Sequence, residues 1–495
     1  MRRRNPVILA AVVAAAAFAG CSSSSKPGTT ANTVAPPTTR PPAPAGPAAR
    51  LSGPITGGLG NIVLTESVPI PLAKYGYTSK EYVAAGIATS YKSVGAQGKD
   101  GHWSVAPIKT APYRTRIIVR VPPAKHFNGT LLVEWMNVTA GSDTDPAFMY
   151  AGNEIVRRGY AWVGVSVQKI GVSGGDAVLP IAGLSNSGLV GSDPARYGSL
   201  RHPGDQYSLD IFSQVARALR APGAAAPLHG LAPKRVLALG ESQSAFELTT
   251  YINAIQPTAR IFDGFFVYSR GGGATPISGG KIQNGISGGI RIRDDNDVPV
   301  FLFETETDEA GLQYFTARQP DSPNLRLWDV AGAAHADAYI VGNDPSVLSN
   351  VLGCTGSVNT APTHYLVAAA LDHLDRWVRT GTPPPSAPRM QVALVKGAPR
   401  VQRDAQGIAI GGVRTGANDV PVAALSGDAP TGTKTLCSLF GSTQPFDAAT
   451  LARLYPTKAS YLAKFRAATD KAIASGYLLP ADRATILAEA AKNKV

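Results

Sequence analysis

The chain has 495 residues, of which 44% are hydrophobic and 16% charged, and its formal net charge at pH 7 is +13. This composition is ordinary for a globular protein and excludes a largely disordered or fibrous chain. Lys and Arg do not cluster among aromatic residues, so the charge favours attraction to anionic envelope surfaces and argues against nucleic-acid binding.

The N-terminus has the pattern of an export signal. Arg2–Arg4 precede an apolar stretch from Val7 to Gly20, which is too short to span a bilayer comfortably. Phe18 to Cys21 resembles a bacterial lipoprotein box, in which Cys21 carries the lipid and becomes the first mature residue. The alternative is an ordinary secretory signal with an incidental cysteine. We predict a signal peptide at 1–20 and a lipid anchor on the outer face of the bacterial cytoplasmic membrane.

Residues 21–50 are rich in Ser, Thr, Pro and Ala and contain almost no large apolar residue. Such a segment cannot bury a core, so we expect a disordered tether.

From Leu51 onward, apolar strand-like runs alternate with helix-like segments. The runs are continuously apolar, as strands covered on both faces must be, and an amphipathic helix is predicted at Gln206–Ala221. The alternation predicts an α/β fold with a mostly parallel, doubly wound sheet. The predicted strands are Thr115–Val121, Gly129–Met136, Tyr160–Val167, Arg235–Gly240, Phe262–Ser269, Pro299–Thr305 and Leu325–Val330.

A serine lies where the strand at Arg235–Gly240 meets the next helix. The pattern G-x-S-x-[GS] occurs at Gly20, Gly171, Gly183, Gly240 and Gly285, but only Ser242 has a strand before it and a helix after it. In a strand–turn–helix elbow the nucleophile has a strained backbone, and its neighbours two residues away must be small. Gly240 and Ser244 meet that requirement. We predict that Ser242 is a nucleophile.

An oxyanion hole beside this serine needs two backbone N–H groups. One is expected from Gln243, the residue after the nucleophile. The other is expected from the loop after the strand at Gly129–Met136, where Asn137 and Val138 are the candidates.

A Gly-rich insertion follows at 271–294. Loops of this length in compact domains are usually functional, and we expect this one to fold over another part of the protein.

A nucleophilic serine needs a base, and the base needs an orienting acid. In α/β-hydrolases the acid and then the histidine follow the nucleophile in the chain. His335 follows the strand at Leu325–Val330 and a small-residue loop, whereas His364 and His373 fall in a predicted helix. The acid should follow the strand at Pro299–Thr305, where either Asp308 or Glu306 can orient an imidazole; we favour Asp308.

A further region, 386–495, is appended to the core at 51–385. It contains strand-like runs at Met390–Val395 and Gly407–Arg414, followed by helices with apolar residues at i,i+4 spacing. After Cys21 only Cys354 and Cys437 remain. In an exported chain this pair predicts a disulfide, with two buried free thiols as the alternative. The cysteines and histidines show no zinc-ligand spacing, so no metal is expected.

Gly240-Glu241-Ser242-Gln243-Ser244 resembles the elbow of the bacterial alpha/beta hydrolase domain family, whose motif reads G-E-S-Q-S. The stretches Phe127–Val138, His202–Gln214, Thr305–Asp308, Arg318–Asp337 and Gly407–Thr415 resemble it too. The resemblance implies an α/β-hydrolase fold and serine hydrolase chemistry without naming a substrate.

The sequence therefore predicts an exported serine hydrolase that cleaves carboxylic esters through an acyl-enzyme and needs no cofactor. Its partners would be a small-molecule or lipid-like ester and the membrane. One alternative is an envelope acyltransferase or peptidase with the same residues. A second is a non-catalytic envelope-binding lipoprotein on a hydrolase scaffold. The oligomeric state is not predicted.

Overall fold

The computed structural model describes residues 44–66, 68–179, 186–220, 225–280, 288–344, 347–430 and 436–495. The predicted signal peptide, Cys21 and most of the tether lie outside these ranges. The end of the predicted tether does not: Ala49 is buried, its N–H donates to Gln214, and strand β1 begins at Arg50. The folded body thus begins slightly before the predicted boundary at Leu51.

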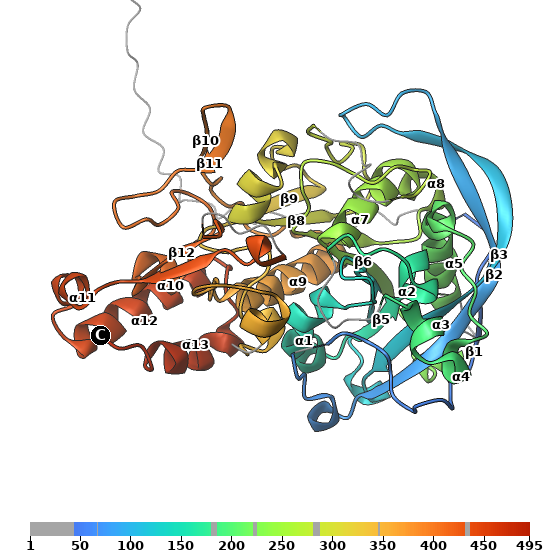
Figure 1. Ribbon diagram of the computed structural model, residues 1–495, viewed down its shortest axis with the longest axis horizontal. Helices are drawn as coiled ribbons and strands as arrows, with labels where there is room; N and C mark the ends of the chain where they lie inside the picture. Colours follow the sequence, from blue (N-terminus) through green and yellow to red (C-terminus); the bar gives the residue numbers. More distant parts are fainter. Residues whose placement is uncertain are drawn as a thin grey trace, which may run out of the picture. The chain divides into compact units, whose positions relative to one another are not determined.

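A nine-stranded sheet lies at the centre of the described residues, with strand order β1-β2-β3-β5-β4-β6-β7-β8-β9 (Figure 1). Strands β4 to β9 are parallel to one another. Strands β1, β2 and β3 form one edge of the sheet with antiparallel pairing, and β3 pairs antiparallel with β5. The parallel strands end at one edge of the sheet, so the loops that follow them meet there. The strands are β1 Arg50–Ser52, β2 Thr78–Val94, β3 Ser104–Val121, β4 Thr130–Trp135, β5 Ala161–Val165, β6 Arg235–Glu241, β7 Gly264–Tyr268, β8 Val300–Thr305 and β9 Leu325–Val330.

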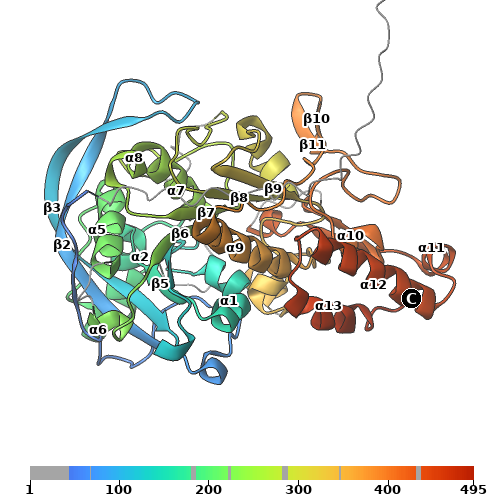
Figure 2. The same cartoon turned by 180° about the vertical axis from the view of Figure 1, so that it is seen from behind.

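Helices cover both faces of the parallel part, as Figures 1 and 2 show. Leu131 and Val133 of β4 pack in the cluster that contains residues of α5 and α7, whereas Leu132 packs in the cluster that contains residues of α1 and α9. This two-sided burial explains why the strands read as continuous apolar runs. The helices of the core are α1 Pro146–Arg158, α2 Lys169–Ser173, α3 Gly188–Ser192, α4 Pro194–Tyr197, α5 Ser208–Arg220, α6 Ala225–Leu228, α7 Gln243–Ala254, α8 Gln256–Ala259 and α9 Thr363–Thr380.

The appended region packs on the cluster that contains α9. Its predicted helix stripe is present on α12, where Tyr461, Phe465 and Thr469 are buried. The strand predicted at Gly407–Arg414 is wrong: Gly411 and Gly412 have φ of 81° and 72°, and this backbone makes only isolated bridges. The elements here are β10 Val392–Val395, β11 Ala398–Val401, α10 Gly416–Asp419, β12 Ala423–Ser426, β13 Ser442–Pro445, α11 Ala448–Leu454, α12 Lys458–Ala474 and α13 Arg483–Ala490.

The described parts of the Gly-rich insertion, up to 280 and from 288, contact the core. Thr275 accepts a hydrogen bond from Thr250 of α7, and Gly279 lies so close to the backbone of Asp205 that a Cβ would clash with it. The expectation that this loop folds over another part of the protein is confirmed for these residues. Among the described residues, no helix combines the length and hydropathy that a membrane span requires.

Candidate active site

Ser242 lies at a sharp turn between β6 and α7. Its φ of 56° is rare for a residue with a side chain, and its N–H donates to Tyr268 on the neighbouring strand. A Cβ on Gly240 would lie 2.9 Å from the Ser244 carbonyl oxygen, so strand and helix leave room only for glycine there. The predicted elbow is therefore present. The other matches differ: Ser173 ends the short helix α2, and those at Gly183 and Gly285 fall largely outside the described residues.

A chain of hydrogen bonds links three of the predicted residues. The Ser242 Oγ lies 2.7 Å from the Nε2 atom of His335, and the His335 Nδ1 atom lies 2.6 Å from the Oδ1 atom of Asp308. His335 and Asp308 are buried, whereas Ser242 is partly exposed. This geometry allows the imidazole to take a proton from the serine while the carboxylate orients the ring.

Asp308 is held by the loop after β8. Its second carboxylate oxygen accepts hydrogen bonds from the N–H and the hydroxyl of Thr305, each at 2.7 Å. The backbone N–H of His335 donates to the Thr307 hydroxyl. The acid and the base are thus fixed to the same turn.

Glu306, the alternative acid, points away from His335. It accepts hydrogen bonds from the N–H groups of Gly332 and Gly427 and from Arg403, at 2.6, 2.9 and 2.7 Å. Two of these partners, Arg403 and Gly427, belong to the appended region. Glu306 therefore ties that region to the loops around the site, and the structure brings Asp308 alone of the two to the imidazole.

A further ionisable group, which was not predicted from the sequence, lies beside the imidazole. The Oε1 atom of Glu241 is 3.6 Å from the His335 Nε2 atom. Burial raises the pKa of the Glu241 carboxyl to about 7. Burial alone lowers the pKa of His335, but Asp308 and the charge of Glu241 raise it more, so the net pKa lies above its ordinary value. The signal that could have identified it is its position as an acidic residue directly before the nucleophile.

The two candidate oxyanion donors on the loop after β4 differ. The N–H of Asn137 is already bonded to the Thr144 carbonyl at 3.0 Å, so it is not available to a substrate. Its side chain donates instead to the Glu241 carbonyl and braces the loop against the elbow. Val138 and Gln243 line one pocket, and Gln243 is the first residue of α7, so its N–H has no partner within the helix. The prediction that the N–H of Asn137 is an oxyanion donor is therefore wrong. The N–H groups of Val138 and Gln243 remain the candidates.

Buried ion pairs hold this loop in place. Arg116 and Arg120 on β3 bind Asp143 and Asp145 of the loop, with N–O distances of 2.7 Å in both pairs. Arg116 also pairs with Glu81, and Arg120 also pairs with Glu66, so the loop is held by a network of mostly buried charges.

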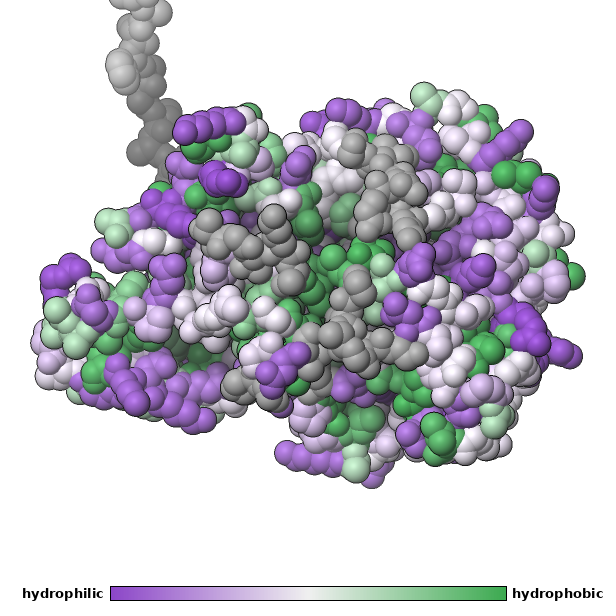
Figure 3. Space-filling model, in the orientation of Figure 1, coloured by the Kyte–Doolittle hydropathy of each residue, from purple (hydrophilic) through white to green (hydrophobic). Residues whose placement is uncertain are grey.

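An apolar pocket of about 160 Å³ opens beside Ser242 and His335. One wall comes from the core, including Met149 of α1. The other comes from Leu352 and from Leu436 to Phe440, and the Cys354–Cys437 disulfide joins these two segments. The predicted disulfide is therefore present. Hydrophobic residues gather near the middle of the face shown in Figure 3, between β12 and α7 of Figure 1.

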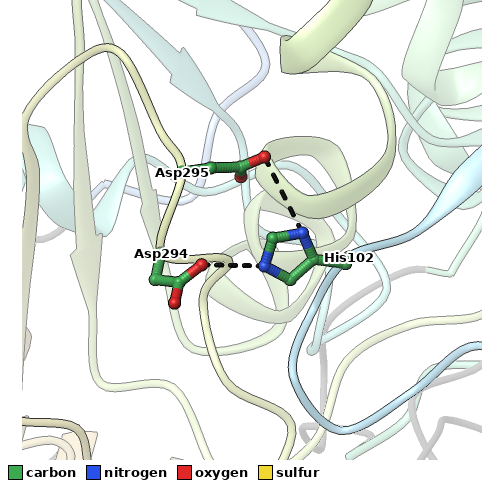
Figure 4. A group of neighbouring side chains, drawn as sticks. All are labelled: His102, Asp294 and Asp295. Atoms are coloured by element: carbon green, nitrogen blue, oxygen red, sulfur yellow. Dashed lines mark hydrogen bonds and ion pairs between the residues drawn. The ribbon is translucent and has the colours of Figure 1, made fainter.

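Among the described residues, one group has the composition of a metal site: His102, Asp294 and Asp295 (Figure 4). The imidazole lies between the two carboxylates: Asp294 is 2.8 Å from its Nε2 atom and Asp295 is 3.7 Å from its Nδ1 atom. Asp295 also makes two hydrogen bonds to Arg293. All three members are exposed, and we interpret the group as surface ion pairs.

Comparison with solved structures gives low similarity. One of two fungal esterases from Rhizomucor miehei is 10% identical, with a TM-score of 0.28, over 59% of this chain and 85% of that one. A serine hydrolase without lid from Xanthomonas campestris is 9% identical, with a TM-score of 0.28, over 53% and 93%. A dienelactone hydrolase-like promiscuous phosphotriesterase from metagenomic libraries is 16% identical, with a TM-score of 0.29, over 58% and 95%. No curated protein matches the chain significantly.

The sequence model of the alpha/beta hydrolase domain family matches residues 51–488, which span the core and nearly all of the appended region. The nucleophile elbow and the sheet order described above agree with that match. The chain belongs to the alpha/beta hydrolase domain family.

Proposed function

We propose that the protein is a serine hydrolase that cleaves carboxylic esters through an acyl-enzyme on Ser242. The observation that carries the proposal is the unbroken hydrogen-bonded chain from the Ser242 hydroxyl through His335 to Asp308 at a strained elbow. A protein that had lost catalysis would not need to keep this geometry. The geometry therefore argues against a protein that only binds the envelope.

In this mechanism the Ser242 Oγ attacks the acyl carbonyl while the His335 Nε2 atom takes its proton. The N–H groups of Gln243 and Val138 bind the oxygen that becomes negative. His335 then gives the proton to the leaving alcohol, and the acyl group stays on Ser242. Water, deprotonated by His335, attacks the acyl-enzyme and releases the carboxylic acid.

Labelling with a fluorophosphonate probe tests the proposal. We expect one labelled peptide, containing Ser242, and parallel loss of ester hydrolysis. Label on another serine, or ester turnover that survives complete labelling, would contradict it. Comparing water with alcohol and amine acceptors then separates a hydrolase from an acyltransferase or a peptidase, because each acceptor yields a different product from the same acyl-enzyme.

We further propose that the enzyme is exported and anchored by a lipid on Cys21. The basic start, the apolar stretch and the box before Cys21 support this, and a disulfide between Cys354 and Cys437 is typical of proteins outside the reducing cytosol. Wild-type protein should partition into detergent, and Cys21→Ala should abolish the partitioning. Wild-type protein recovered in the medium with an unmodified N-terminus would refute the anchor.

A further inference from the structure

The walls of the apolar pocket beside Ser242 suggest what kind of substrate enters it. Seventeen of the described residues line this pocket, and among these seventeen only Glu241 and His335 are ionisable. Neither supplies a permanent positive charge. An ionised carboxylate or phosphate on the substrate would therefore lose its hydration here without gaining a partner.

The outer wall is a small hydrophobic cluster of its own. Leu352, Cys354, Cys437 and Phe440 are buried in it, and partly buried side chains such as Ile340 pack against it. This cluster contains residues from the loop after His335 and from the appended region. The pocket is thus closed by chain segments that are distant in sequence.

Three backbone hydrogen bonds and the disulfide hold this wall beside the histidine. The N–H of Ala336 donates to the Leu439 carbonyl, and the N–H of Asn359 donates to the Phe440 carbonyl, at 3.0 and 2.9 Å. The N–H of Ala338 donates to the carbonyl of Asn359 at 2.9 Å. Movement of the wall would therefore change the pocket directly beside the reacting atoms.

The other side of the site carries more charged and polar side chains. The pocket that Val138 and Gln243 line has a volume of about 240 Å³ and also contains Lys169 and Asp205. An ester bound at Ser242 can direct an apolar group to one side and a polar group to the other. This contrast predicts that the acyl and alcohol groups of the ester bind on different sides of Ser242.

We infer that the pocket beside Ser242 binds an uncharged hydrocarbon group of the ester, and that the disulfide-linked wall sets the length of that group. The inference rests on the proposed function. An apolar cavity of roughly 150 Å³ holds a benzene-sized molecule of six carbons. The pocket of about 160 Å³ therefore fits a hydrocarbon group of that size, supplied by either the acyl or the alcohol side.

Two series of esters measure this preference. In one series the acyl chain of a nitrophenyl ester varies from about two to twelve carbons, which brackets the six-carbon estimate. In the other series the alcohol chain of an acetate ester varies over the same range. In the series whose chain enters the pocket, kcat/KM should rise about fourfold per methylene until the pocket is full and then level or fall. The other series should be flatter. A flat profile in both series overturns the inference.

Charge gives an independent readout. A monoester of a dicarboxylic acid, compared with the methyl-terminated acyl ester of equal length, should react about a hundredfold more slowly or worse, because the described lining residues offer its free carboxylate no permanent cation. The same comparison applies to the alcohol series. Equal rates overturn the inference.

Variants of the wall identify the pocket. Leu352→Ala should move the optimum to longer chains, and Leu352→Trp should move it to shorter ones. Met149→Ala tests the core wall if the Leu352 variants fold poorly. Leu394→Ala, at a side chain that is 63% exposed in the appended region, is the matched control and should leave the profile unchanged. An unmoved optimum in both Leu352→Ala and Met149→Ala overturns the assignment.

Reduction tests the disulfide. After reduction, or in Cys354→Ser/Cys437→Ser, the length preference should flatten while a small fluorophosphonate still labels Ser242. If the fluorophosphonate labels Ser242 and the preference for hydrocarbon length is unchanged, the disulfide does not help to set that length. Failure to label Ser242 in the oxidised wild-type protein is a different result, because it refutes the proposed function itself.

Discussion

The two sides of the candidate site are fixed by different means. The reacting residues lie on turns that follow β6, β8 and β9, and buried hydrogen bonds to Thr305, Thr307 and Tyr268 hold them. The hydrophobic cluster of the outer wall contains no residue of the main sheet, and the wall is held by this cluster, three backbone hydrogen bonds and the Cys354–Cys437 disulfide. Sheet geometry therefore positions the three residues of the proposed mechanism, and cross-links between loops position the wall of the pocket. Changes on the two sides should have separable effects.

The largest effect is expected at the reacting residues. Ser242→Ala and His335→Ala should each lower kcat/KM by about 10⁴-fold or more, because either loss disables the same step. The double variant should be scarcely slower than either single one. Circular dichroism should match the wild type in both variants. Thermal unfolding should match it in Ser242→Ala, whereas His335→Ala removes a buried side chain and should unfold at a lower temperature. An additive double variant would mean that the two residues do not act together.

The next comparison separates Asp308 from Glu306. Asp308→Asn should lower kcat by about 10⁴-fold, because an amide favours the wrong tautomer of His335. Glu306→Gln should keep most of the activity but lower the free energy of unfolding by about 1–3 kcal/mol, since buried donors lose their acceptor. Denaturant unfolding and kinetics on the same preparations measure both. The reverse pattern would make Glu306 the acid.

Loss of the disulfide should lower the stability of the protein in addition to its effect on the length preference. Cys354 and Cys437 are 83 residues apart, and chain entropy gives about 4–5 kcal/mol for closing such a loop, as an upper figure. Cys354→Ala/Cys437→Ala should unfold at lower denaturant concentration. Alkylation of denatured, unreduced wild-type protein should label neither cysteine. Two labelled cysteines would mean that the bridge does not form.

The smallest expected effect concerns pH. His335 must be neutral to act as the base, so kcat/KM should fall as pH drops through its raised pKa. Glu241→Gln removes a negative charge beside the imidazole, which lowers the pKa of His335 and moves the acid limb of the profile to lower pH.

Glu154→Gln is the matched control for this change. Glu154 is also buried, and its pKa is likewise raised to about 7, but it pairs with Arg157 on α1. The Glu154→Gln variant should leave the acid limb of the kcat/KM profile at the same pH. An equal shift in both variants would assign the effect to net charge and not to the contact between Glu241 and His335.

The parallel sheet was predictable because burial on both faces leaves a direct mark on the sequence. Each predicted strand in the core overlaps one that the structure contains, and Ser242 was selected by its place between β6 and α7. The long hairpin of β2 and β3 was only partly predicted. β2 is rich in Ala, Ser and Thr, and its pairing with β3 makes it a strand.

The choice of acid and the pocket walls could not be settled from sequence. Asp308 and Glu306 lie two residues apart in a turn, and only the partners of Glu306 in the appended region show which way each points. The same holds for Asn137, whose N–H is bonded to a carbonyl seven residues later. Contacts between distant segments leave no periodic signal.

The hydrogen bond between Ala336 and Leu439 also bears on the timing of maturation. Ribosomes make the chain from its N-terminus, so Ser242, Asp308 and His335 all exist before the segment at Leu436–Leu439 that completes their surroundings. A product truncated before Leu436 would contain the reacting residues and Cys354, but it would lack the second cysteine and half of the wall. Selectivity for substrate would thus be acquired last, when the C-terminal segment has folded back and been oxidised.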